Sequence, residues 1–163
     1  MRTLKLYGLI AFVGLFAIGC ENSQLAGGKY LLNVEPADPQ TPTRVKESVA
    51  EPTRMVVAGR VEAGDIEPFQ DGVATFVMTQ LPDEAHAGGD PDHVENCPFC
   101  QRELRNAPKA IVRILDESGE VMSVDARELL GVSKGDVVVV EGLVTYLEPV
   151  NTVQIDAEGI FIR

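Results

Sequence analysis

Residues 130–142 read LGVSKGDVVVVEG and contain the strongest fold signal in the sequence. Four consecutive valines open an apolar, β-branched run, which predicts a strand over 137–147. Lys134-Gly135-Asp136 directly before the run is typical of a turn. Gly142 lies inside the run, at a position where a sheet has to coil. The stretch therefore predicts a tight turn that leads into a long, coiled strand.

A short helix is predicted just before that turn. Asp125 suits the N-cap position, and Glu128 three residues later completes a capping-box pattern. Gly131 suits the left-handed residue that follows the last turn of a helix. Together these signals limit the helix to barely two turns.

The other apolar residues between Met55 and Arg163 also fall into short runs rich in β-branched side chains, which predicts four more strands. The first two runs are Met55–Glu62 and Val73–Leu81. The third is Ala110–Leu115, which continues through a turn at Glu117–Glu120 into Val121–Val124. The last is Thr152–Ile155, which is followed by a bulge at Gly159 and by Ile160–Ile162. Residues 55–163 have the common size of one domain. The sequence therefore predicts one mainly β domain of five strands.

The order of these elements resembles an OB-fold barrel, in which five strands carry one helix between the third and the fourth. Gly59 and Gly142 lie inside the first and fourth predicted strands, where a barrel sheet coils. Residues 130–142 are similar to the passage from helix to fourth strand in many OB domains. The resemblance implies a fold and leaves the ligand open. An immunoglobulin-like sandwich is disfavoured, because the chain has too few strands and contains the helix.

The first nineteen residues have the features of an export signal. Arg2 and Lys5 precede an apolar stretch over 6–18, which is shorter than the about 20 residues that a spanning helix needs. The stretch ends at Ala17-Ile18-Gly19-Cys20. This sequence resembles the lipobox of bacterial lipoproteins, although Ala17 stands where that pattern usually has Leu.

The lipoprotein resemblance implies that residues 1–19 are removed and that lipid on Cys20 holds the protein to a membrane outside the cytoplasm. Lipoproteins retained in the inner membrane often carry Asp after this cysteine. Glu21 stands there in this chain, which favours the outer membrane. An ordinary secretory signal or an uncleaved anchor is the alternative, and either of them still exports the rest of the chain.

Residues 20–54 are predicted to be a lipidated, flexible tether. Four prolines lie among Ser, Thr, Gln and charged residues in this segment, which offers few apolar side chains to bury. A flexible chain of this length has a reach of roughly 30 Å. The barrel is therefore expected to stand clear of the lipid headgroups.

Charge argues against a nucleic-acid partner. The chain has 14 basic and 25 acidic residues. Removal of the signal takes Arg2 and Lys5 and no acid, so 12 basic and 25 acidic residues remain, a net charge of −13. Phosphate binding requires clustered Lys and Arg. The chain also lacks G-x-S-x-G, P-loop and H-E-x-x-H patterns, so we predict a binding module and not an enzyme.

An insertion over 82–107 separates the second and third predicted strands, and connections of this length are typically functional or disordered. It contains both histidines and two of the three cysteines: His86, His93, Cys97 and Cys100. Their spacing is H-x6-H-x3-C-x2-C. Asn96 is placed to cap a helix that has Cys97 and Cys100 in its first turn and that Pro108 ends.

This spacing predicts a metal site. Two cysteines separated by two residues can place both sulfurs on one ion, and His86 and His93 would complete a tetrahedral set of ligands. Residues 97–104, CPFCQREL, resemble half of a zinc knuckle, in which C-P-x-C wraps the metal, but the other half of that motif is missing. Zinc fits these ligands best, and copper(I) comes next because soft thiolates accept it.

Other interpretations of the insertion stay open. In one interpretation, Cys97 and Cys100 form a disulfide or a redox-active dithiol in an oxidising compartment. The βαβ pattern that surrounds such a pair in thioredoxin-like proteins is missing from this sequence. In another interpretation the histidines are only solvated, and the domain is a structural envelope protein that binds an unknown protein partner. A c-type haem is excluded, because Gln101 stands where C-x-x-C-H requires histidine.

Overall fold

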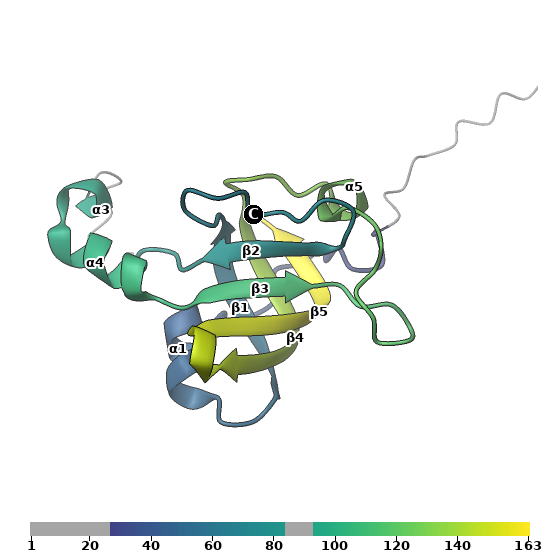
Figure 1. Cartoon of the computed structure of the whole chain (residues 1–163), viewed down its shortest axis with the longest axis horizontal. Helices are drawn as coiled ribbons and strands as arrows, with labels where there is room; N and C mark the ends of the chain where they lie inside the picture. Colours follow the sequence, from purple (N-terminus) through teal and green to yellow (C-terminus); the bar gives the residue numbers. More distant parts are fainter. Residues whose placement is uncertain (1–26, 84–92) are drawn as a thin grey trace, which may run out of the picture.

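Five strands carry the fold in the computed structural model, which describes residues 27–83 and 93–163 (Figure 1). The strands are β1 Thr53–Val61, β2 Thr75–Thr79, β3 Lys109–Arg113, β4 Val137–Leu147 and β5 Thr152–Ile162. The helices are α1 Pro42–Ser48, α3 His93–Asn96, α4 Pro98–Asn106 and α5 Ala126–Leu130, with a 3-10 turn, η1, at Glu148–Val150.

The strands close into a barrel in the order β1-β2-β3-β5-β4, with β4 pairing back onto β1. Every pairing is antiparallel except that of β3 with β5, which is parallel. Helix α5 lies between β3 and β4 in the chain. This arrangement confirms the predicted OB-like fold. The predicted continuation of the third strand over 121–124 is not a strand, and only an isolated bridge joins Leu115 to Val121.

The strand that the sequence predicted best is β4, which spans the predicted residues 137–147. Val138, Val139 and Val140 are completely buried, as expected for a β-branched run in a core. Gly142 is required by close approach, because a Cβ at this position would lie 2.2 Å from the carbonyl oxygen of Asp156. The pairing register between β4 and β5 shifts at this point, which confirms the bulge predicted beside Gly159.

Helix α5 begins and ends where the sequence predicts. Gly131 has a φ of 70° and ends the helix in the left-handed conformation. The Asp125 carboxylate accepts a hydrogen bond from the backbone N–H of Arg127 at 2.9 Å. The Asp125 side chain thus caps the N–H of the second helical residue, Arg127. A capping box would instead use the N–H of the third, Glu128. The Arg127 guanidinium also pairs with Asp125 and Asp71 at 2.6 Å each.

These contacts predict acid sensitivity. The hydrogen bond from Arg127 holds the pKa of Asp125 well below its usual range, so the stabilisation by this carboxylate is complete above the unfolded-state pKa of about 3.9 and is lost as the pH falls further. Asp125→Asn removes the charge and keeps a capping side chain. Above about pH 4 the wild type is therefore expected to have the larger free energy of unfolding in urea. The difference between wild type and variant is expected to decrease as the pH falls below about 4. A difference that stays constant down to pH 2 would contradict this assignment.

The predicted tether is wrong for residues 27–54, because this segment packs onto the barrel. Tyr30 is only 8% exposed and Val45 is completely buried, and both belong to the hydrophobic core. The Tyr30 hydroxyl donates a hydrogen bond to the carbonyl of Leu115 at 3.0 Å. Composition alone does not reveal this docking, since a few apolar side chains are enough to attach a largely polar segment to the core.

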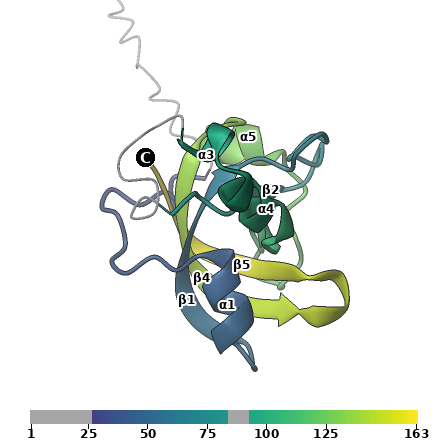
Figure 2. The same cartoon turned by 90° about the vertical axis from the view of Figure 1, so that its left-hand side faces the viewer.

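Backbone hydrogen bonds hold the same segment along its length. The N–H of Leu32 donates to the carbonyl of Ile160 at 2.8 Å, and the N–H of Gln40 donates to the carbonyl of Val56 at 2.8 Å. Helix α1 follows Thr41, its N-cap, and contacts β1, β4 and β5. Helices α1 and α5 lie on opposite sides of the barrel (Figures 1 and 2). The folded domain therefore begins by residue 27 at the latest.

The described part of the insertion forms two short helices, α3 and α4, which lie beside each other and away from the barrel strands (Figure 1). The N-cap of α4 is Cys97, and not Asn96 as predicted, because Asn96 already ends α3. Within residues 27–83 and 93–163, no helix is long and apolar enough to span a bilayer.

Candidate metal centre

Two helix termini bring three of the four predicted ligands together. His93 is the first residue of α3, Cys97 joins the two helices, and Cys100 lies in the first turn of α4. Residues three apart in a helical turn point to the same side, so both sulfurs face one point. Pro98 occupies the first helical position, where its fixed φ favours this turn and no N–H is lost.

The ligand atoms of His93, Cys97 and Cys100 all lie within 4.8 Å of one another. Atoms bound to one tetrahedral zinc at about 2.0–2.3 Å lie about 3.3–3.8 Å apart. Side-chain rotations that move each atom by about 1 Å or less are therefore enough to bind one ion. The fourth predicted ligand, His86, lies outside the described residues, as does Cys20.

The two thiols interact with each other. A hydrogen bond to the Cys97 side chain is the largest cause that raises the pKa of Cys100 above its ordinary value, and desolvation and the charges of Cys97 and Glu103 add to it. Two neighbouring thiolates repel each other, so without a cation at least one sulfur keeps its proton. A divalent cation between the sulfurs reverses this preference, because it attracts both thiolates at once.

The site combines shielding with access. The Nε2 atom of His93 is shielded from solvent, while Cys97 and Cys100 are partly buried and are not joined by a disulfide in this structure. Phe99, which lies between the two cysteines in the sequence, is 81% exposed. Helix α4 buries none of its residues. The ligands thus meet at the surface of the molecule and not in its core.

Cys100 also lines a small hollow that sequence reasoning missed. The other residues around the hollow are Gln80, Pro82, Asp83, Glu103 and Leu104. Its two acidic residues are Asp83, near the start of the insertion, and Glu103 in α4, near the end of the insertion. No spacing rule links these positions, and only the folded chain places them beside a cysteine.

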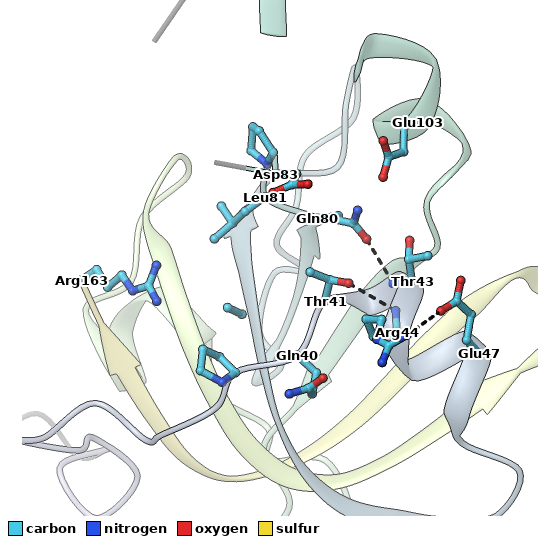
Figure 3. A pocket seen from close by; sticks show the side chains of 13 residues that line it. Gln40, Thr41, Thr43, Arg44, Glu47, Gln80, Leu81, Asp83, Glu103 and Arg163 are labelled. Carbon is cyan, nitrogen blue, oxygen red and sulfur yellow. Dashed lines mark hydrogen bonds and ion pairs between the residues drawn. The ribbon is translucent and has the colours of Figure 1, made fainter. Parts of the chain in front are cut away.

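The hollow adjoins a larger surface pocket of about 510 Å³. The two share Gln80, Pro82, Asp83 and Glu103, and α1 supplies the opposite wall of the larger pocket (Figure 3). Gln80 accepts a hydrogen bond from the backbone N–H of Thr43 at 3.1 Å, which fixes the end of β2 to the start of α1. The docked segment 27–54 therefore shapes the surface next to the cysteines.

Comparison of this chain with family models, with curated proteins and with solved structures gives no match.

Proposed function

We propose that this protein is an extracytoplasmic binding module that binds one transition-metal ion through His93, Cys97 and Cys100. The observation that carries the proposal is the convergence of one imidazole and two thiols within 4.8 Å. Zinc is the first choice, because borderline Zn²⁺ accepts both nitrogen and thiolate ligands. Copper(I) is the second, because two sulfurs form a soft site.

The fourth ligand is proposed to be His86, as the spacing predicts, or a water molecule. A structural zinc site has four protein ligands, whereas a site with three protein ligands keeps one position open. The His86→Ala variant separates these cases. A protein fourth ligand makes zinc binding weaker in the variant, whereas a water ligand leaves the affinity unchanged.

We further propose that lipid on Cys20 anchors the protein to a membrane outside the cytoplasm, with the outer membrane favoured. The N–H of Gly27 donates to the carbonyl of Leu129 at 3.0 Å, so at most six residues, 21–26, separate Cys20 from the docked chain. Six residues and their flanking bonds span at most about 25 Å when extended. The barrel is thus expected closer to the lipid than a tether over 20–54 would place it.

Metal binding is tested on the purified protein made without residues 1–19. Elemental analysis is expected to find one zinc per chain after dialysis against buffered zinc. Intact mass of the protein made with its signal in bacteria tests the anchor separately, through a lipid-sized increase that Cys20→Ser abolishes. Absence of bound zinc and copper would refute the metal proposal and leave the anchor proposal to its own test.

A thiol-disulfide redox protein is the second candidate, favoured by the hydrogen bond between the two cysteine side chains. Formation of the Cys97–Cys100 disulfide releases two protons and passes two electrons to a partner disulfide, which becomes a dithiol. Thiol counting separates the candidates. In a metal-binding protein, two thiols react with the thiol reagent only after a chelator has removed the metal. A redox protein is instead isolated with its cysteines oxidised, and it undergoes thiol-disulfide exchange with a dithiol reductant.

A further inference from the structure

We infer that the metal bound by His93, Cys97 and Cys100 is exchangeable cargo and not an ion that stabilises the barrel. This inference rests on the proposed metal binding and concerns what the ion does once it is bound. A structural ion is coupled to the fold of its domain, because binding free energy then appears as folding free energy. An exchangeable ion enters and leaves while the domain stays folded.

The first observation is where the core lies. Among the described residues, the buried hydrophobic cluster runs from Met78 directly to Ala110 and includes none from α4. Helix α4 has no buried residue. The barrel core therefore does not depend on α4, the helix that carries Cys100 in its first turn, and loss of the ion removes no α4 packing from it.

The second observation is what the two helices contact. The main packing partner of α3 within the described chain is α4. Both helices lie beyond the end of β2 and the start of β3, to one side of the barrel strands (Figure 1). A short helical hairpin held at its ends can open without breaking the strand pairings, since segments with few buried contacts have low local stability.

The third observation is a route for the ion. Cys100, Asp83 and Glu103 line the same small hollow. Clefts lined by acidic groups raise the local concentration of cations and speed their association. Oxygen ligands bind zinc or copper(I) less strongly than thiolates do, so these carboxylates can pass an ion to the sulfurs without holding it.

Thermal unfolding of the barrel tests the inference. It is monitored by far-ultraviolet circular dichroism on the full mature chain, with and without zinc. A ligand at 100 times its Kd that binds only the folded barrel is expected to raise Tm by roughly 10 °C. Uncoupled cargo is expected to shift Tm by less than about 2 °C, because the hairpin binds the ion whether or not the barrel is folded.

Transfer of zinc to a chromogenic chelator completes the test. Transfer is expected to run faster than global unfolding measured on the same sample. A large Tm shift, or transfer limited by the unfolding rate, would overturn the inference while leaving metal binding intact. If equilibrium dialysis detects no bound metal, the proposed function fails and the inference fails with it.

The Glu103→Gln variant tests whether the ion reaches the cysteines past Glu103. The control is Glu117→Gln, which also removes one negative charge but lies in the exposed turn after β3. Glu103→Gln is expected to slow zinc association several-fold at low ionic strength without changing Tm, and Glu117→Gln is expected to match the parent. Equal association rates in both variants would contradict a route past Glu103.

Discussion

A Cys97→Ser variant is expected to bind zinc more than about 100-fold less tightly than the parent protein. Substitutions that touch only the partners of metal ligands already cost about 10–100-fold in affinity, and this change removes a thiolate itself. The hydroxyl of serine does not ionise near neutral pH, so one charged ligand of the three is lost. Competition with a chelator of known affinity measures the change.

Arg102→Ala is the matched control, because Arg102 is an exposed residue of the same helix. It is expected to leave the affinity within about two-fold of the parent, while Cys100→Ser is expected to reproduce the loss seen for Cys97→Ser. Circular dichroism should show the same barrel signal in all three variants. Full zinc affinity in both serine variants would show that the metal is bound elsewhere.

Val45→Asp is expected to destabilise the folded protein by about 3–5 kcal/mol, the cost of an uncompensated charge in a core. Val45 is completely buried in α1 and belongs to the same core cluster as the barrel side chains. A flexible tether would not respond to this substitution. The midpoint of urea unfolding therefore reports directly on whether the segment before β1 is part of the domain.

Val34→Asp provides the comparison, because Val34 lies in the same segment and is 78% exposed. It is expected to change stability by no more than about 0.5 kcal/mol. Equal effects of the two substitutions, whether both small or both large, would contradict the burial described for Val45. Aspartate is the substituent in both variants, so the difference isolates the environment.

Local patterns were enough to predict much of the barrel. The β4 strand has a long β-branched run, and α5 has Asp125 and Gly131 at its ends, so neighbours in sequence determine both elements. The closing of the barrel also followed from element order. In contrast, β2 is shorter than predicted, because pairing partners and not propensity set its ends at Thr75 and Thr79.

The docking of residues 27–54 could not be predicted from composition. Tyr30 starts a run of only three apolar residues and Val45 is isolated, both in a proline-containing, polar segment, and their burial depends on surfaces contributed by strands far along the chain. Helix α1 has a signal that was available, since Thr41 precedes Pro42 as N-cap before the first helical residue. That local signal was outweighed by the overall composition.

The candidate site also has one part that the sequence could predict and one part that it could not. The pair Cys97 and Cys100 and the nearby His93 are close in sequence, so spacing alone predicted that they meet. The hollow beside Cys100 was not predictable, because Asp83 and Glu103 lie twenty positions apart and converge only in the folded chain. Local spacing thus identified the ligands, and tertiary structure showed the surface from which an ion would approach them.

X-ray absorption at the zinc edge of the mature, zinc-loaded protein tests directly whether both cysteines bind the metal. We expect two sulfur neighbours at about 2.3 Å and nitrogen or oxygen neighbours at about 2.0–2.1 Å around one zinc per chain. Loss of one sulfur neighbour in Cys97→Ser would assign the shell to this pair. A parent spectrum with oxygen and nitrogen neighbours only would contradict the proposed site.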